Sequence, residues 1–329
     1  MDGLICQDIG RDAIYLIRAV ARRGIRFSKA ICYGNSYNVD ESDLLEYFAR
    51  DVGTKIVAAY IERVKTGGRF LKALQRLSTE KPVILLKAGY TQRKAGSLPS
   101  VADVSLESGR FWNGLVDQVR VSRVYDLEEL VDMLVSFSYL RPPQGRRVAI
   151  YGGGGGFGVL ATDEFAAAGF VVPALPQQMQ KEIGQETRSS LKSDAGLILR
   201  NPVDVANLMS REAHYHILKR LATYEGLDLL IVQCSLNNSA WPRAGYHFVI
   251  WPDHLADAVI QTHREVSKPI AVVLHGILSS SDFERATDLQ RRYYEAGLPV
   301  YGSISGAAKA IDRLIHYYEG RHGDSCSAG

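Results

Sequence analysis

The residues with the most evident chemical potential form a glycine-rich run that directly follows a short apolar stretch. Five consecutive glycines, Phe157 and a further glycine join VAIY (148–151) to VLATDEFAAAGF (159–170), which has the composition of a helix. Glycines let backbone N–H groups approach an anion, and the start of a helix adds positive partial charge. Two interpretations stay open here: a phosphate site, or a tight strand-to-helix turn. The residues that would face a phosphate are Gly153, Gly154, Gly155, Gly156 and Gly158.

The glycine-rich run departs from the two common nucleotide-binding motifs. A Walker A loop ends in Lys followed by Ser or Thr, and this run lacks both residues. A dinucleotide fingerprint needs an acidic residue at the end of a second strand about 20 residues further on, and none stands clearly there. The anion-binding interpretation therefore depends on backbone N–H groups.

A second candidate region is the polar segment from Ala88 to Glu107, which contains no convincing helix or strand. Segments of this length without regular structure often carry function in compact domains, and the alternative is a solvated surface loop. The segment holds several hydroxyl and charged side chains but neither histidine nor cysteine. We take Ser100 and Asp103 from it as candidate crevice residues.

Further candidates stand where predicted strands end, because open parallel sheets bind ligands at the carboxyl ends of their strands. Glu62 follows KIVAAYI, Asn201 and Asp204 lie in RNPVDV, and His275 ends PIAVVL. A histidine in such a place can equally be a packed or capped residue. Elsewhere, the neighbouring pair of histidines in SREAHYHILKR has no third ligand at metal spacing, so we expect no metal site.

Short apolar stretches alternate with amphipathic ones along the chain. This alternation predicts an α/β fold with doubly wound parallel sheets and helices on both faces. In the first half the expected strands are 3–6, 30–33, 55–60, 82–87 and 119–124, with helices over 13–21, 42–49, 69–77 and 126–139. In the second half the expected strands are 148–151, 227–233, 269–274 and 300–301, with helices over 158–168, 252–265, 282–296 and 303–318.

The segment LRPPQGRR (140–147) breaks this alternation with two prolines, a glycine and three arginines, which is typical of a linker. We therefore expect a first domain over residues 1–140, a linker over 141–147 and a second domain over 148–321. The small, polar residues 322–329 are expected to form a mobile tail.

The composition excludes several classes of protein. The 329 residues are 46% hydrophobic and 23% charged, which is ordinary for a globular chain of about two domains. The net charge of +3 leaves no broad basic face for nucleic acid or a membrane surface. Four scattered cysteines, the acidic residues near Met1 and the lack of a long apolar span favour a cytoplasmic protein with free thiols.

Six stretches, in order, resemble the NDP-forming acyl-CoA synthetases, the superfamily of acetyl-CoA and succinyl-CoA synthetases. They are GNSYNVDESDLLEYFARD (34–51), KIVAAYIERVKTGGRFLKAL (55–74), KPVILLKAGYT (81–91), RVYDLEELVDML (123–134), RVAIYGGGGGFGVLATDEFAAAGF (147–170) and RNPVDV (200–205). The resemblance covers most of the chain up to about residue 205 and is looser beyond it. It implies two flavodoxin-like CoA-ligase domains, each a doubly wound sheet.

The resemblance also implies parts that we expect this chain to lack. In the family a CoA-binding domain precedes the matching region, an ATP-grasp module supplies the nucleotide chemistry, and a histidine carries a phosphoryl group between sites. Aligning back from Arg123 puts Ser100 at the family's serine and Val101 at the phosphohistidine, and no histidine occurs before His214. We therefore expect ATP with Mg²⁺ and CoA to be handled through partner chains, an ATP-grasp subunit and a CoA-binding subunit, with no cofactor held by this chain itself.

By the same resemblance, part of the family's phosphate cradle persists. Glu62 matches the acidic residue that orients the phosphohistidine, and the glycine-rich run matches a phosphate-facing loop. The opposing loop reads Cys6-Gln7-Asp8-Ile9 where the family has Ser-Gln-Ser-Gly, and the charge of Asp8 disfavours an anion there.

Three functions remain open from the sequence. The favoured one is a subunit of an acyl-CoA ligase that activates a carboxylate through an acyl phosphate without the histidine relay. The second is a related ligase component in which the activated acyl group meets an amine or another nucleophile. The third is a non-catalytic scaffold or regulatory pseudoenzyme. A homo-oligomer is compatible with each of them.

Overall fold

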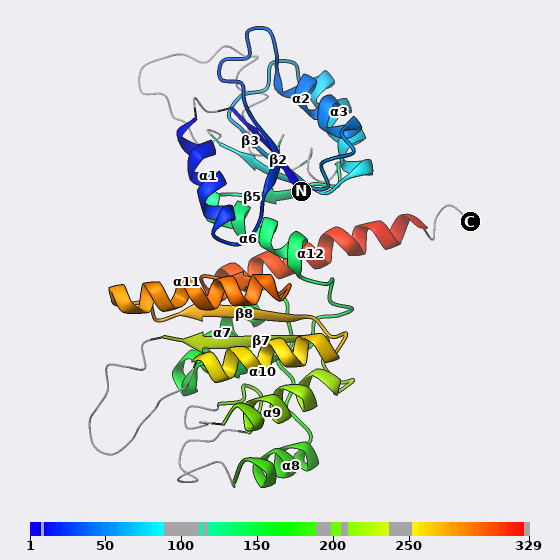
Figure 1. Ribbon diagram of the computed structural model, residues 1–329. Helices are drawn as coiled ribbons and strands as arrows, with labels where there is room; N and C mark the ends of the chain where they lie inside the picture. Colours follow the sequence, from blue (N-terminus) through cyan, green and yellow to red (C-terminus); the bar gives the residue numbers. More distant parts are fainter. Residues whose placement is uncertain are drawn as a thin grey trace, which may run out of the picture. The chain divides into compact units, whose positions relative to one another are not determined.

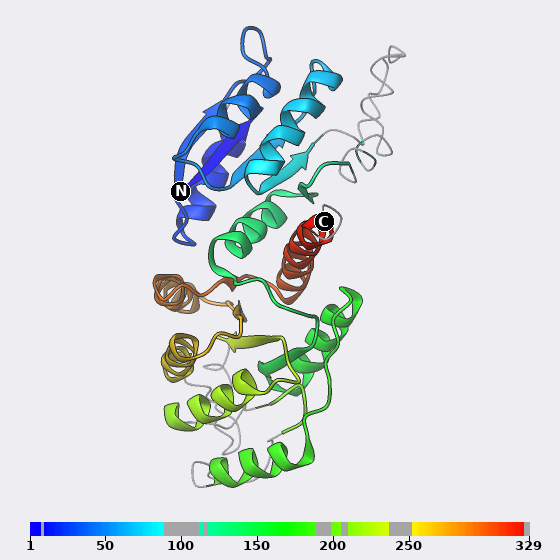
Figure 2. The same cartoon turned by 90° about the vertical axis from the view of Figure 1, so that its right-hand side faces the viewer.

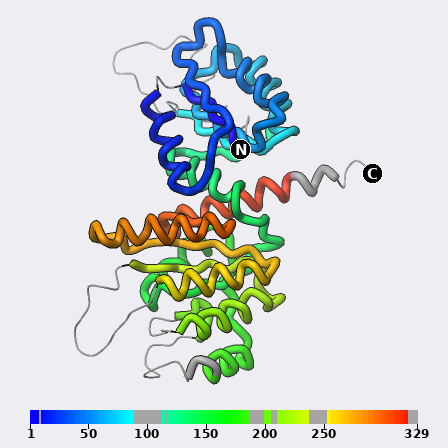
Figure 3. The backbone as a smooth tube through the Cα atoms, viewed as in Figure 1, coloured from blue at the N-terminus to red at the C-terminus, as the bar shows by residue number. Residues whose placement is uncertain are grey.

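The computed structural model describes residues 1–7, 10–88, 112, 114, 118–188, 199–204, 210–236 and 252–325 (Figure 3). The described chain divides into two compact units, the first over 1–137 with residues from His316 onward, the second over 138–315. Each unit has its own parallel sheet.

The first unit is a doubly wound sheet with the strand order β2-β1-β3-β4-β5, and every pairing in it is parallel. This is the flavodoxin-like order, so the expected fold of this half is confirmed. The strands are β1 (Asp2–Cys6), β2 (Phe27–Cys32), β3 (Val57–Ile61), β4 (Val83–Lys87) and β5 (Ser122–Val124). The helices are α1 (Arg11–Ala21), α2 (Glu41–Arg50), α3 (Gly67–Glu80) and α6 (Leu127–Tyr139).

The apolar strands explain why helices cover both faces of this sheet. Strands β1, β3 and β4 are buried throughout, so that alternate side chains need a partner on each face. Ile5, Val57 and Leu85 pack with α2 and α3, whose inward residues include Leu45 and Phe70. Helices α1 and α6 lie on the other side of the sheet (Figure 1).

Helix α2 begins where the sequence places a strong start signal. The Asp40 side chain accepts from the backbone N–H groups of Ser42 and Asp43, and the Asp43 carboxylate accepts from the N–H of Asp40. This reciprocal capping box pairs donors that no intrahelical bond can reach. The end of the preceding loop, at the carboxyl edge of the sheet, is thereby held in place.

The second unit repeats the parallel arrangement with the strand order β6-β7-β8-β9. Two isolated parallel bridges, Arg147 to Val171 and Tyr151 to Val203, lie on the far side of β6 from β7. The strands are β6 (Val148–Gly152), β7 (Leu229–Ser235), β8 (Ile270–His275) and β9 (Val300–Tyr301). The helices are α7 (Gly154–Ala167), α8 (Gln177–Arg188), α9 (Arg211–Thr223), α10 (Pro252–Glu265), α11 (Ser280–Glu295) and α12 (Ile304–Ser325).

The two faces of the second sheet are covered by different helices. Leu230, Val232 and Cys234 of β7 join one apolar core with residues of α9, α10 and α11. Helix α7 lies on the opposite face (Figure 2). Gln233, which alternates with those core residues along β7, therefore faces away from them.

Helix α12 belongs to both units, which departs from the expected domain boundaries. The sequence places residues 148–321 in one domain, whereas residues from His316 onward cluster with the first unit. The physical reason includes an edge-to-face contact of Tyr317 with Phe137, whose ring centroids are 5.0 Å apart. The helix also continues to Ser325, into the expected tail, and residues 326–329 lie outside the described part.

Asp132 of α6 provides a pH-dependent test of the packing in the first unit. The residue is 7% exposed, and burial raises its pKa to about 7. An unfolded aspartate titrates near 4, so the folded state binds the extra proton between about pH 4 and 7. The free energy of unfolding should therefore fall as the pH rises through this window, because the folded state must then bury a charge.

We expect Asp132→Asn to stabilise the protein by about 2–4 kcal/mol at pH 8 and to have little effect near pH 4, where the carboxyl is already neutral. Urea unfolding of both proteins at the two pH values measures the difference. An equal gain at pH 4 and pH 8 would show that the buried charge is not its cause.

Within the described residues, no helix combines the length and the apolar character needed to span a lipid bilayer.

Candidate functional site

The glycine-rich run forms the junction between β6 and α7. Gly152, Gly153 and Gly154 have φ angles of 85°, 86° and 77° in the left-handed region, which side chains strongly disfavour. The helix begins at Gly154, earlier than residue 158 where the sequence predicts it. The glycine-rich run therefore forms both the bend that follows β6 and the first helical turn of α7.

Three of these glycines lie close to atoms of neighbouring residues. A Cβ on Gly152 would lie 2.5 Å from the carbonyl oxygen of Gln233, and one on Gly153 would lie 2.7 Å from its Oε1 atom. A Cβ on Gly158 would lie 3.2 Å from Cβ of Pro202. The turn interpretation thus accounts for these three positions without any ligand.

Packing does not account for Gly155 and Gly156. A Cβ on Gly156 would meet no other atom within 4 Å, and both residues are exposed. A Cβ on Gly155 would make only an ordinary contact, 3.8 Å from Oδ2 of Asp204. These two positions leave the first-turn backbone of α7 open to an approaching group.

The amino end of α7 has the properties of an anion site. The N-cap residue is Gly153, so no side chain there bonds to the free N–H groups of the first turn. Such N–H groups carry partial positive charge and point outward from the helix start. The neighbouring carboxylate of Asp204 opposes this potential, which favours a phosphate whose charge is partly neutralised by a bound cation.

Gln233 lies directly beneath this turn. Its side chain is fully buried, and within the described part of the chain neither amide atom has a hydrogen-bond partner. Buried amides without partners are rare, because their desolvation is uncompensated. The sequence offers only a weak signal for this residue, a single polar letter in the strand LDLLIVQ, and our sequence analysis did not select it.

His275 lies at the end of β8, close to the same helix. Its ring packs against Phe157 of α7 with centroids 4.4 Å apart and planes at 40°. Burial lowers the pKa of His275, so the imidazole is neutral at neutral pH. Both ring nitrogens are buried and lack a partner among the described residues. The structure thus brings His275 to the α7 side of the carboxyl edge, beneath a half-exposed phenyl ring.

Asn201, one of the predicted crevice residues, bonds to backbone on both sides of its amide group. Its Nδ2 donates to the carbonyl oxygens of Val148 and Pro173, and its Oδ1 accepts from the N–H of Ile150. The side chain therefore bonds to the backbone of β6 and of the segment beside it. Three of the four hydrogen bonds that the amide can make are thus made to backbone groups.

Glu62 lies in a separate pocket at the carboxyl edge of the first unit. The pocket has a volume of about 470 Å³ and is lined by Gln7, Gly34, Asn35, Ser36, Tyr37, Glu62, Arg63, Val64 and Lys65. The Glu62 carboxylate accepts from the hydroxyl of Tyr60 at 3.1 Å. Burial, aided by Glu62, raises the pKa of that hydroxyl, so it remains a donor.

Two further side chains position the backbone of Glu62. The Oε1 atom of Gln7 accepts from the N–H groups of Glu62 and Arg63, each at 2.8 Å. The buried Lys87 donates to the carbonyl oxygen of Glu62 at 2.6 Å. These supports were not predicted, since they depend on contacts between residues far apart in the sequence.

Several predicted site residues lie outside the described part of the chain. They are Ser100, Val101 and Asp103 of the long polar segment, together with Asp8 and Ile9 of the loop after β1. Their roles stay as predictions.

Comparison with known proteins gives this geometry a family context. Residues 3–137 match the succinyl-CoA ligase like flavodoxin domain. Two relatives from Pyrococcus furiosus, the alpha subunits of ADP-forming acetate–CoA ligases I and II, are 28% and 30% identical over 301 and 304 residues. Those alignments cover 89% and 91% of this chain. The chain is thus similar in sequence to ADP-forming acetate–CoA ligases, and its first unit matches a flavodoxin domain of the succinyl-CoA ligase type.

The match to this family is partial in length. The chain spans 59% and 62% of the two Pyrococcus relatives, or about three fifths. A solved structure, the apo form of a dinucleotide-forming acetyl-coenzyme A synthetase 1 from Ca. Korarchaeum cryptofilum, superimposes with a TM-score of 0.73 at 22% identity. The superposition covers 99% of this chain and 67% of the Korarchaeum chain, and it supports the fold of both halves. The chain has the two parallel-sheet units that its sequence predicts.

Proposed function

We propose that this chain is the subunit of an ADP-forming acyl-CoA synthetase-like ligase that holds an acyl phosphate while partner chains act on it. In this proposal an ATP-grasp chain supplies the phosphoryl group and a CoA-binding chain supplies the thiol. The first turn of α7 is the observation that carries the proposal, because Gly155 and Gly156 leave backbone N–H groups open without a packing reason.

The residues of this chain would bind and orient rather than form a covalent intermediate. The N–H groups of the α7 first turn would donate hydrogen bonds to the phosphate oxygens of the acyl phosphate, stabilising the charge that develops on the leaving phosphate. Asp204 favours a phosphate that carries Mg²⁺, which agrees with nucleotide chemistry supplied by a partner. Glu62, held by Gln7 and Lys87, offers a fixed carboxylate in its own pocket.

The proposal includes no phosphohistidine intermediate, because the expected relay position holds no histidine. Valine at position 101 offers no lone pair to accept a phosphoryl group. The acyl phosphate would therefore be formed and consumed in one place, without a carrier between two sites. Transfer to an amine or another nucleophile in place of CoA is a variant of the same chemistry.

A scaffold or regulatory role is the competing function, and a specific observation favours it. Gly152, Gly153 and Gly158 have packing reasons to persist, so that the glycine-rich run alone does not demand a ligand. The two functions differ in whether anything binds at Gly155 and Gly156.

Release of ADP by the assembly tests the proposal. The assembly is purified from its native host through a tag on this chain, and carboxylate mixtures are supplied with and without CoA. We expect ADP release that depends on the carboxylate, and its dependence on CoA identifies the acceptor. The control omits the carboxylate. Absence of release with the partner chains demonstrably present would contradict the proposal and favour the scaffold.

A further inference from the structure

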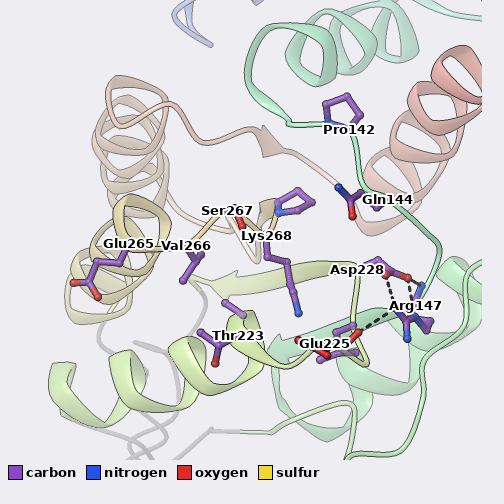
Figure 4. Close-up of a pocket in the computed structure, with 13 residues that line it drawn as sticks. Pro142, Gln144, Arg147, Thr223, Glu225, Asp228, Glu265, Val266, Ser267 and Lys268 are labelled. Carbon is purple, nitrogen blue, oxygen red and sulfur yellow. Dashed lines mark hydrogen bonds and ion pairs between the residues drawn. The ribbon is translucent and has the colours of Figure 1, made fainter. Parts of the chain in front are cut away.

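A pocket of about 590 Å³ opens in the second unit at the amino ends of its strands (Figure 4). Arg147 precedes β6, Asp228 precedes β7, and Lys268 precedes β8. This edge of the sheet is opposite to the carboxyl edge, where the glycine-rich turn and His275 lie. The pocket is therefore separate from the candidate site described above.

Lys268 projects into this pocket and bonds to the end of a helix. Its Nζ donates to the carbonyl oxygens of Leu221, at 3.4 Å, and of Tyr224, both at the carboxyl end of α9. Burial lowers the pKa of Lys268 to about 8, so roughly half of the lysine is a neutral amine at pH 8 and about a tenth at pH 7. A neutral amine has two N–H bonds, enough for both carbonyls, and its lone pair then remains free.

Arg147 gives the same pocket an anchor for an anion. Its Nε and Nη2 atoms donate to the Asp228 carboxylate, at 3.0 and 2.7 Å, and Nη2 also donates to the carbonyl of Glu225. Among the described residues no bond is made by Nη1, whose two N–H groups belong to a side chain that is 50% exposed. Guanidinium N–H groups of this kind bind phosphate oxygens well.

We propose that Lys268 is a site of Nε-acylation by an acyl phosphate bound in this pocket, with Arg147 holding its phosphate group. The amine lone pair attacks the acyl carbonyl carbon, and the bond from that carbon to the phosphate oxygen breaks. Phosphate leaves with the electron pair, and the nitrogen releases one proton to water, which leaves an amide. The inference goes beyond the proposed function and rests on it only for the cellular source of the acyl phosphate.

Acylation at Lys268 would alter the end of α9. The amide nitrogen carries no charge and a single N–H, so one of the two carbonyl oxygens loses its donor. The added acyl group would also fill part of the pocket. The extent of this modification would depend on the concentration of acyl phosphate. The concentration would thereby alter the capping of α9 in the second unit.

Lys81 provides a matched internal control in the first unit. Its Nζ donates to the carbonyl oxygens of Phe48, at 2.6 Å, and Asp51 at the end of α2, and burial lowers its pKa too. The pocket at that end of α2 is lined by acidic residues, Tyr47, Arg50 and Val52, and Lys81 is not part of its wall. The two lysines thus share the capping role but not the pocket.

The test incubates the purified full-length chain with acetyl phosphate and measures the occupancy of each lysine by peptide mass spectrometry over time. We expect Lys268 to react at least 10-fold faster at pH 8 than Lys81 and than the exposed Lys55 and Lys72. Its rate should saturate with acetyl phosphate, level off above about pH 8 and fall when inorganic phosphate competes. Acetyl-CoA, which lacks a phosphate on the reacting carbonyl, should react without saturation.

A rate at Lys268 no higher than at Lys55 and Lys72, or one without saturation and without phosphate competition, would overturn the proposal. Arg147→Gln should raise the half-saturating concentration of acetyl phosphate at Lys268 without changing the rate at Lys72. If that variant does not fold, the phosphate competition in the unaltered chain decides the question. Because the reagent is added directly, the result does not depend on whether the assembly releases ADP.

Discussion

Gly156→Asp should abolish anion binding at the first turn of α7 while making the second unit more stable. Residue 156 is the third residue of the helix, where a carboxylate interacts favourably with the helix dipole, and a helical glycine costs about 1 kcal/mol relative to alanine. The new side chain meets no atom near its Cβ. For a unit of this size we expect a gain in Tm of about 2–4 °C.

The same carboxylate would stand where a phosphate is expected. Two like charges about 4 Å apart at a protein surface repel by roughly 4 kcal/mol, so we expect at least a ~100-fold loss of affinity for phosphate and of ADP release. Gly156→Ala is the matched control, since it shares the gain in stability and leaves binding within about threefold. Calorimetric titration with inorganic phosphate measures both variants. Unchanged ADP release by Gly156→Asp would mean that the turn serves packing alone.

Gly152→Ala should have the opposite effect on stability, although it changes a glycine four residues away. The φ of 85° costs an L-residue roughly 1–2 kcal/mol, and the clash of its Cβ with the Gln233 carbonyl adds about 1–3 kcal/mol. The contact is with backbone, which cannot rotate away.

Chemical or thermal unfolding should therefore show a loss of about 3 kcal/mol for Gly152→Ala, or roughly 6–12 °C in the Tm of the second unit. Gly156→Ala, with the same added methyl group, serves again as the control and should be stabilising. A loss below about 1 kcal/mol for Gly152→Ala would mean that β6 and β7 separate easily at this point.

The strands could be predicted well because strands that are buried on both faces consist almost entirely of apolar residues. Stretches such as VILLK of β4 are apolar on both faces, and this pattern is specific to a parallel sheet covered by helices. Helix α8 was not predicted, because QQMQKEIGQETR is almost entirely polar. Met179 and Ile183 are the apolar residues of this helix that contact the core of the unit. A helix with so narrow an apolar stripe gives little periodic signal.

The start of α7 was predicted four residues too late for a related reason. Glycine has the second-lowest helix propensity of the natural residues, so a run of glycines indicates a loop. Here the left-handed φ angles of Gly152, Gly153 and Gly154 turn the chain, and the backbone of the next glycines continues as helix. Packing of the turn against β7 thus outweighs the low helix propensity of these glycines.

The candidate site was predicted less completely than the fold. The type and order of residues selected the glycines, Glu62 and His275, all of which lie at carboxyl ends of strands. The orientation of a side chain could not be predicted in this way. Asn201, for example, bonds to the backbone of β6. Gln7 bonds to Glu62 and Arg63, and Gln233 lies beside Gly153. These residues are far apart in the sequence, and their distances in space cannot be read from a single sequence.

The membership of α12 in both units has a consequence for how the protein is made. Residues 1–137 of the first unit leave the ribosome early, but the part of α12 that completes this unit follows only after the whole second unit has been translated. At about 5–20 residues per second, the intervening segment takes roughly 10–40 s to synthesise. During that interval the ring of Tyr317 has not yet been translated, so the side chain of Phe137 lacks this packing partner.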